Sequence, residues 1–242
     1  MYAKNAWKKY SGEKLNELMA FNEEYKDYIT KGKTERLCVK EAIKLAEEKG
    51  FKNLKEFKSL KEGDKVYVVN KDKNIAAFVI GKKPIEDGLR ILGAHIDSPR
   101  IDVKQNPIYE KNGFSLLDTH YYGGIKKYQW TTIPLSIHGV MVKSNGEKVY
   151  LNIGEDENDP VFYVTDLLPH LAQDQMKRAA NEIIKGEELN ILVGSLPLED
   201  TKENAVKKQV LKLLNYINDG MRIAGNKTVF NIDEVMKNWY TF

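Results

Sequence analysis

A short apolar run that leads into a histidine-containing polar segment constrains the fold of this chain more than any other feature. Residues 89–92 have the pattern of a buried strand. Pro99 then prevents a helix from continuing through residues 93–98. His95 and Asp97 are therefore expected at the end of a strand, where α/β sheets open their active sites. The sequence predicts an α/β fold with both side chains at this edge.

The His-x-Asp pattern formed by His95 and Asp97 suits metal binding. The carboxylate can hold the imidazole in the tautomer that leaves one ring nitrogen lone pair free for a metal. The same tripeptide also arises by chance, and a polar loop after a strand is the plainer interpretation of these residues alone. The choice between the two depends on what the rest of the sequence adds.

Composition indicates a globular protein in water. The 242 residues are 42% hydrophobic and 30% charged, which suits a chain with a core and not a disordered one. The apolar stretches are shorter than a membrane span, and the first residues lack the apolar segment of a signal peptide. Cys38 is the single cysteine, which excludes an internal disulfide and a cysteine-based zinc site. We expect a cytoplasmic location and no membrane partner.

Charge gives little support for nucleic-acid binding. The chain has 38 basic and 35 acidic residues, so its net charge is only +3. Five of the basic residues are arginine, the residue best suited to bidentate contacts with phosphates and bases. Lysines are spread among glutamates, as on ordinary solvated surfaces. We expect no nucleic-acid partner.

Two helices and a hairpin are expected before the histidine segment. One helix begins near Ser11, and a second runs from the cap Thr34 to just before Gly50, with the cysteine on its apolar stripe. That cysteine is interpreted as a core residue and not as a nucleophile. Two apolar runs, residues 66–69 and 75–80, flank a polar turn and predict a hairpin.

The pattern changes after the proline, where residues 101–153 alternate between apolar and polar with turn residues between. Asn145 and Gly146 separate two such stretches, which is a strong hairpin signal. We interpret this region as a separate, mostly antiparallel β module, and we assign no role to its histidines His120 and His138. Four further elements are expected: a mixed helical segment that opens at residues 165–171, a strand at 189–193, and helices at 204–217 and 233–237.

Four stretches together resemble one known family. They are residues 93–99, residues 122–124 with Trp130, residues 134–139 and residues 166–171. In order and spacing they resemble the aspartyl aminopeptidase and vacuolar aminopeptidase I family of zinc metallopeptidases. The resemblance covers roughly residues 5–217 and corresponds to the N-terminal half of that family.

The resemblance implies an α/β fold made of two parts. Residues 1–99 would be the first part of a zinc-exopeptidase catalytic domain. Residues 100–217 would be an inserted β-rich domain for dimerisation and assembly, and residues 218–242 an atypical tail. The implied partners are peptide substrates and further copies of the chain, joined as a homo-oligomer through the inserted domain.

The resemblance also assigns roles to individual residues. Members of the family hold two zinc ions that bridge a water molecule. His95 matches the first zinc ligand, and Asp97 matches the catalytic carboxylate that orients it. His170 matches a catalytic histidine that reaches the active site of a neighbouring subunit and contacts the substrate. A direct metal contact by His170 is the second possibility.

The family also needs groups that this sequence lacks. After the insertion it supplies a bridging aspartate, a Glu-Glu pair with the general base, another acidic ligand and a last histidine, whereas no histidine follows His170 here. We therefore expect a portion of a zinc-dependent aminopeptidase that is inactive alone and whose first 99 residues are marginally stable. The alternative is a non-catalytic assembly or interaction protein derived from the family. A truncation, a frameshift or a natural non-catalytic paralogue would each explain the missing groups, and the sequence does not choose between them. Substrate preference and subunit number also stay open.

Overall fold

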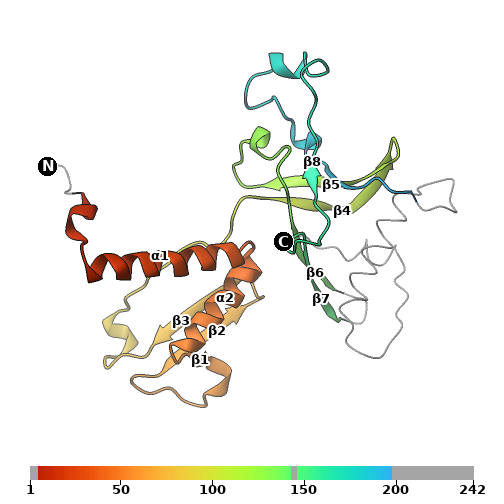
Figure 1. The fold of residues 1–242 in the computed structure, drawn as a ribbon. Helices are drawn as coiled ribbons and strands as arrows, with labels where there is room; N and C mark the ends of the chain where they lie inside the picture. The colour runs from red at the N-terminus through yellow and green to blue at the C-terminus, as the bar shows by residue number, and fades with distance from the viewer. Residues whose placement is uncertain (1–4, 143–145, 198–242) are drawn as a thin grey trace. The chain divides into compact units, whose positions relative to one another are not determined.

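The computed structural model describes residues 5–142 and 146–197, and the chain divides into two compact units, residues 1–98 and 99–242 (Figure 1). Three expectations therefore lie outside the described residues: the helices at 204–217 and 233–237, and the tail at 218–242. Within the described part of the chain, no helix has both the length and the apolar character needed to cross a membrane.

The first unit contains two helices and a small sheet. Its elements are the short 3-10 helix η1 (Ala6–Lys9), α1 (Glu13–Lys31), α2 (Glu35–Glu48), β1 (Lys52–Asn53), η2 (Leu54–Glu56), β2 (Lys65–Asn70), β3 (Asn74–Val79) and η3 (Ile85–Asp87). The sheet order is β1-β2-β3, with β1 parallel to β2 and β2 antiparallel to β3. The two helices and the β2–β3 hairpin expected from the sequence are confirmed.

Local chemistry explains the corner between the two helices. Thr34 caps α2, because its hydroxyl oxygen accepts a hydrogen bond from the backbone N–H of Leu37 at 3.3 Å. Gly32 ends α1 where the chain passes close to Cys38: a β-carbon at Gly32 would lie 2.8 Å from the Cys38 sulfur. The Cys38 thiol is buried and donates to the Gly32 carbonyl at 3.0 Å, and burial raises the pKa of that thiol. Cys38 is thus a packing residue.

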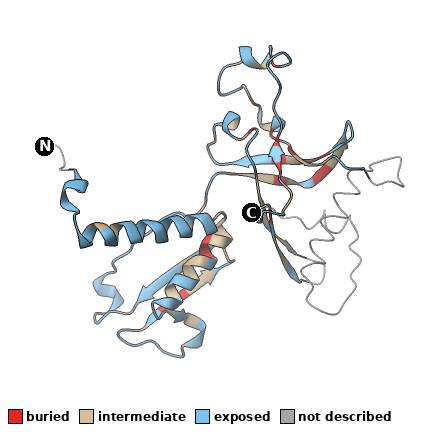
Figure 2. Cartoon of the chain, viewed as in Figure 1, coloured by how far each residue is buried: buried red, intermediate tan, exposed pale blue. Residues whose placement is uncertain are grey.

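The first unit buries very little. Among its described residues the buried hydrophobic side chains are Cys38, Val39, Val66 and Tyr67. Figure 2 shows the helices and strands of this unit as mostly exposed, with few buried positions on α2 and the sheet. A unit of this length normally encloses a larger core, since hydrophobic burial is the main term that offsets the loss of chain entropy.

The strand expected at residues 89–92 is absent, and that prediction was wrong. These residues have no regular secondary structure and lie in no described sheet, and Leu92 is fully exposed. The physical reason is that a strand exists only through hydrogen bonds to a neighbour. No strand among the described residues pairs with this run, so its apolar pattern has no sheet to enter.

The second unit is built on antiparallel strands. Its elements are β4 (Arg100–Lys111), β5 (Phe114–Tyr122), η4 (Lys127–Gln129), β6 (Ile137–Val142), β7 (Lys148–Ile153), β8 (Tyr163–Val164), η5 (Gln175–Lys177), η6 (Gly186–Glu188) and β9 (Ile191–Gly194). One sheet has the order β4-β5-β9-β8, and β6 pairs with β7 in a separate hairpin. The expected antiparallel pairing and the strand near residues 189–193 are confirmed.

One contiguous hydrophobic core lies in this second unit. Leu117, Ile153, Leu189 and Val164 are each at most 2% exposed and belong to the same cluster. Leu117 comes from β5, Ile153 from β7 and Val164 from β8, and Leu189 lies in the turn that precedes β9. The core therefore joins elements that are far apart in sequence. Burial of these side chains is the main stabilising contribution visible in the chain.

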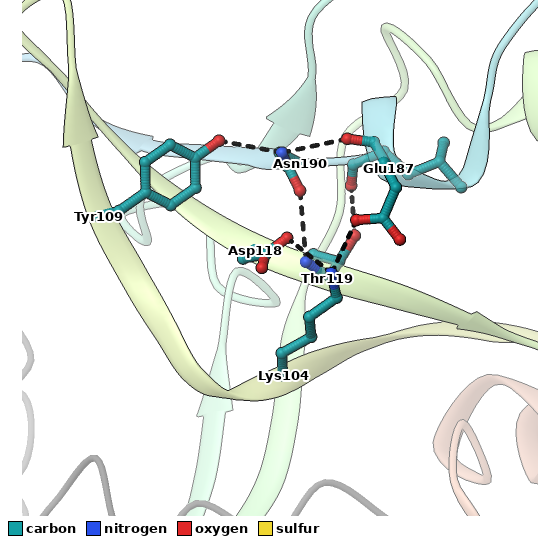
Figure 3. A network of polar contacts seen from close by, with 7 residues as sticks. Lys104, Tyr109, Asp118, Thr119, Glu187 and Asn190 are labelled. Atoms are coloured by element: carbon teal, nitrogen blue, oxygen red, sulfur yellow. Dashed lines mark hydrogen bonds and ion pairs between the residues drawn. The ribbon is translucent and has the colours of Figure 1, made fainter.

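Hydrogen bonds fix the segment 187–190 against β5 (Figure 3). The hydroxyl of Thr119 donates to the carbonyl of Leu189 at 2.6 Å, and the Thr119 backbone N–H donates to the Asn190 side-chain oxygen at 3.3 Å. The Asn190 amide then donates to the hydroxyl of Tyr109 on β4 at 2.9 Å. One asparagine therefore links β4, β5 and the chain that enters β9.

Lys104 adds an ionic contact to the same face (Figure 3). Its ammonium lies 2.8 Å from a carboxylate oxygen of Glu187 and 3.2 Å from one of Asp118. Hydrogen bonds to Glu187 and Asp118 raise the pKa of Lys104. Lys104 lies within the strand irregularity between Val103 and Ile108, and the two carboxylates hold its side chain there.

We expect the two units to differ in resistance to protease. Limited trypsin digestion of the full chain should cleave residues 5–98 first, because that unit buries few side chains and opens at a low free-energy cost. The fragment containing β4, β5, β8 and β9 should persist, as read by mass spectrometry. Loss of that fragment while residues 5–98 remain intact would contradict this expectation.

A second prediction concerns acid stability. Asp159 accepts three backbone N–H hydrogen bonds, from Gly154 at 2.7 Å, Glu155 at 3.1 Å and Asp156 at 3.3 Å, and these hydrogen bonds, that from Gly154 foremost, lower its pKa. A lowered pKa contributes stability that is present above the ordinary aspartate range near 4 and is lost as the pH falls through the lower value.

The thermal midpoint of Asp159→Asn should therefore lie below that of the unchanged chain at neutral pH. The difference should shrink as the pH falls below about 4. Asp174→Asn is the matched control, since the Asp174 side chain is 95% exposed. A difference that stays constant from pH 7 to pH 3 would show that the Asp159 charge is not the cause.

Candidate metal-binding site

His95 and Asp97 lie in the irregular segment that connects η3 to β4. The His95 Nδ1 atom lies 3.0 Å from the Asp97 carbonyl oxygen and 3.2 Å from the carboxylate oxygen Oδ1. The sequence predicted that the Asp97 carboxylate lies near the His95 ring, and this contact is confirmed. The His95 side chain is 85% exposed and that of Asp97 is 42% exposed, so the imidazole projects into solvent.

This geometry selects one tautomer of the ring. A backbone carbonyl can only accept a hydrogen bond, so the 3.0 Å contact requires the proton on Nδ1. In the neutral ring, Nε2 then carries a free lone pair, which is the form that binds a metal ion. One imidazole is thereby prepared as a ligand by its own neighbour two residues along the chain.

The described residues do not complete a zinc site. Within residues 5–142 and 146–197, no three His, Cys, Asp or Glu side chains lie close enough together to hold a metal ion. A catalytic zinc needs about three protein ligands and an open position. His95 supplies one ligand and Asp97 its orienting partner, so these residues fit part of such a site and not the whole.

His170 belongs to the second unit and lies in an exposed turn at residues 169–171. The mixed helical segment expected here is wrong: one turn closes through the N–H groups of Leu171 and Ala172, which both donate to the Leu168 carbonyl, at 2.9 Å and 3.0 Å. Pro169 has no N–H, and the helical structure that follows it before β9 consists of the short 3-10 helices η5 and η6. His170 is thus presented at the surface by a turn.

Asp166 fixes the start of this turn. Its carboxylate accepts from the backbone N–H of Leu167 at 2.8 Å, from the Gln175 side-chain amide at 3.0 Å and from the Thr131 hydroxyl at 3.4 Å. The polar anchor leaves the neighbouring leucines exposed: Leu167, Leu168 and Leu171 are 54%, 61% and 63% exposed. An exposed histidine surrounded by exposed leucines is typical of a surface that meets another protein surface.

A serine, a histidine and a glutamate also meet in the second unit, a cluster that the sequence analysis did not anticipate. Ser136 Oγ and Glu155 Oε1 each lie 2.9 Å from His138 Nε2. A catalytic triad needs the serine and the acid on opposite ring nitrogens, whereas here both contact the same one. The cluster therefore links β6 to the chain after β7 and is not arranged for nucleophilic catalysis.

Comparison with known protein families shows which family this chain belongs to. Residues 28–236 match the family described as aminopeptidase I zinc metalloprotease (M18). The chain belongs to this family. The resemblance noted in the sequence is confirmed, and membership of M18 makes the chain a relative of hydrolases that are described as zinc metalloproteases.

M18 relatives of known sequence and structure agree. A probable M18 family aminopeptidase 1 of Clostridium acetobutylicum is 53% identical over 217 residues, which are 88% of this chain and 47% of that protein. A crystal structure of a Thermotoga maritima M18 aminopeptidase matches with a TM-score of 0.82 and 44% identity, covering 90% of this chain and 47% of that one.

Aminopeptidase I from Clostridium acetobutylicum has also been solved, and it matches with a TM-score of 0.78 and 44% identity. That match covers 97% of this chain and 50% of the solved chain. The chain thus spans about half the length of the M18 relatives that it matches. The mixed α/β fold is that of M18 aminopeptidase structures.

The tautomer of His95 can be measured directly. Long-range proton–nitrogen NMR spectra at a pH where the ring is neutral should show the proton on Nδ1, because Asp97 accepts it. Asp97→Ala removes the carboxylate acceptor but keeps the backbone carbonyl, so the fraction of Nδ1–H rings should fall without being abolished. His120 on β5 is the internal control and should not change. A wild-type His95 protonated on Nε2 would contradict the geometry described above.

Proposed function

We propose that this chain is part of a zinc-dependent aminopeptidase that removes N-terminal residues from peptides. His95 is its first zinc ligand, and Asp97 orients the ring. The observation that carries the proposal is the contact between His95 Nδ1 and Asp97, which leaves Nε2 available, in a chain of the M18 family. The remaining ligands of a two-zinc site come from polypeptide beyond the described residues.

His170 is proposed to contact the substrate of a neighbouring copy, with a direct metal contact as the second possibility. Its exposed turn and the leucines beside it support this role, because a group that acts in another subunit must be presented at a surface. We assign residues 1–99 to the catalytic domain and residues 100–217 to an inserted assembly domain that forms a homo-oligomer. The cytoplasmic location stays a prediction from the single buried cysteine.

A second candidate is a non-catalytic assembly protein. The observation that favours it is the contrast between the units: the second has a contiguous core, whereas the described residues of the first provide only one prepared ligand. Both candidates belong to the same family and assemble through the inserted domain, residues 100–217. They differ in whether His95 takes part in hydrolysis.

Hydrolysis of leucyl and aspartyl chromogenic amides separates the two candidates. The chain alone should show no chelator-sensitive turnover, because its described residues do not complete a zinc site. A chimera should be active with added zinc. The chimera joins this chain, in place of the matched 47% of the Clostridium acetobutylicum relative, to the rest of that relative.

Variants of the chimera test the individual residues. His95→Ala should abolish turnover, and Asp97→Asn should lower zinc affinity or activity by about 10- to 100-fold, the usual effect of losing a group that orients a ligand. His120→Ala is the matched control and should leave turnover unchanged. A chimera that stays active with His95→Ala would overturn the metal role. A folded, assembled chimera without any turnover would support the assembly protein.

A further inference from the structure

One side-chain hydrogen bond closes the loop that presents His170. The Gln175 side-chain amide donates to Asp166 Oδ1 at 3.0 Å, across nine positions of the chain. The same oxygen accepts the backbone N–H of Leu167 at 2.8 Å. Residues 166–175 are called the His170 loop below, and Figure 1 shows this part of the chain, between β8 and η6, projecting away from the sheet. A bond between its two ends restricts the conformations open to the loop.

Backbone hydrogen bonds and one buried side chain make the His170 loop compact. The Ala172 N–H donates to the Leu168 carbonyl at 3.0 Å, and the Met176 N–H donates to the Ala172 carbonyl at 2.8 Å. Ala172 is 4% exposed, whereas Leu168 and Leu171 are exposed. The buried alanine therefore anchors the middle of the loop, and His170 lies two residues before this anchor.

A second segment of the chain contacts the other oxygen of Asp166. Thr131 is 7% exposed, and its hydroxyl lies 3.4 Å from Asp166 Oδ2 and 3.2 Å from the Tyr128 carbonyl oxygen. A carboxylate and a carbonyl can only accept, so the two share the single hydroxyl hydrogen. Thr131 also forms a parallel bridge to Val164, a residue of the hydrophobic core. The threonine thereby ties Asp166 to the core.

The backbone next to Thr131 is strained. Thr132 has a φ of 61°, and a β-branched residue in this left-handed region is a genuine outlier. The Thr132 N–H donates to the Val164 carbonyl at 2.8 Å, which helps to hold the residue in this conformation. Strain of this kind persists where surrounding contacts impose it, and it is concentrated at functional sites. Here the strained residue adjoins the threonine that contacts Asp166.

We infer that Asp166, Gln175 and Thr131 are positioning residues that hold His170 in one orientation before a neighbouring copy binds. Their contacts all lie within one chain, so the entropy cost of ordering the loop falls on folding and not on association. The consequence for catalysis rests on the proposed function, in which His170 contacts the substrate of the neighbouring copy. The ordering of the loop itself does not depend on that function.

Gln175→Glu tests the closing hydrogen bond with little change of shape. It replaces the amide donor by a carboxylate, which the Asp166 carboxylate repels. The double variant Asp166→Asn/Gln175→Glu should restore the bond, because the amide introduced at position 166 can donate to the introduced carboxylate. Gln173→Glu is the matched control, since it makes the same substitution at an exposed position of the same loop.

Hydrogen exchange in the full chain measures the loop without any substrate. The N–H groups of Ala172 and Met176 should exchange about tenfold faster in Gln175→Glu than in the unchanged chain, and the double variant should return them to the original rate. Thr131→Val, which keeps the shape and removes the hydroxyl, should also speed their exchange, whereas Thr131→Ser should not. The thermal midpoint of Gln175→Glu should equal that of the unchanged chain, because Gln175 lies outside the hydrophobic core.

Kinetics of the chimera test the consequence for catalysis. Gln175→Glu should lower kcat by about tenfold to a hundredfold and leave KM nearly unchanged, as expected when a group that acts in the transition state is displaced by about 1 Å. The double variant should recover kcat. Gln173→Glu should have the kcat of the unchanged chimera.

Three results would overturn the inference. The first is equal exchange of the Ala172 and Met176 N–H groups in Gln175→Glu and the unchanged chain. The second is a double variant that exchanges as fast as Gln175→Glu, and the third is an active chimera whose kcat is the same with and without Gln175→Glu. A chimera without turnover would refute the proposed function, and hydrogen exchange in the full chain would then decide the inference by itself.

Discussion

The hydrogen bond from the Thr119 hydroxyl to the Leu189 carbonyl, at 2.6 Å, is the contact on which the second unit depends. Both groups are buried, so an unmade bond there would cost the desolvation of a hydroxyl and a carbonyl. The bond fixes the chain that enters β9, and β9 in turn connects β5 to β8. The core and the turn that carries His170 are built around this sheet. The described residues of the first unit bury fewer side chains than those of the second.

Local signals in the sequence were sufficient to predict much of the fold. Thr34 predicted the start of α2 because capping is a contact within one turn. The β2–β3 hairpin followed from two apolar runs around a polar turn. The Asn-Gly signal was used at residues 145–146 but overlooked at Asn112 and Gly113, where both residues have the positive φ that a tight hairpin turn requires, 53° and 77°.

The failures were of a different kind, because they depend on neighbours that the sequence does not name. Residues 89–92 have the composition of a strand, but only a partner makes a strand. Pro107 is buried within β4, where the pairing shifts between Val103 and Ile108, a position that tolerates a residue without an N–H. For the candidate site, the His95–Asp97 contact was predictable because it is local. The His138–Glu155 contact spans 17 residues and was not.

Cys38 gives this chain an internal reporter. Its thiol is 6% exposed, hydrogen-bonded to Gly32, and packed where α1 meets α2. A thiol reagent can reach the sulfur only when this corner opens, and the raised pKa of the buried thiol further slows its reaction in the closed state. With one cysteine in the whole sequence, every labelled molecule records an opening at this corner. The labelling rate thus measures the local opening equilibrium of the helix pair without any mutation.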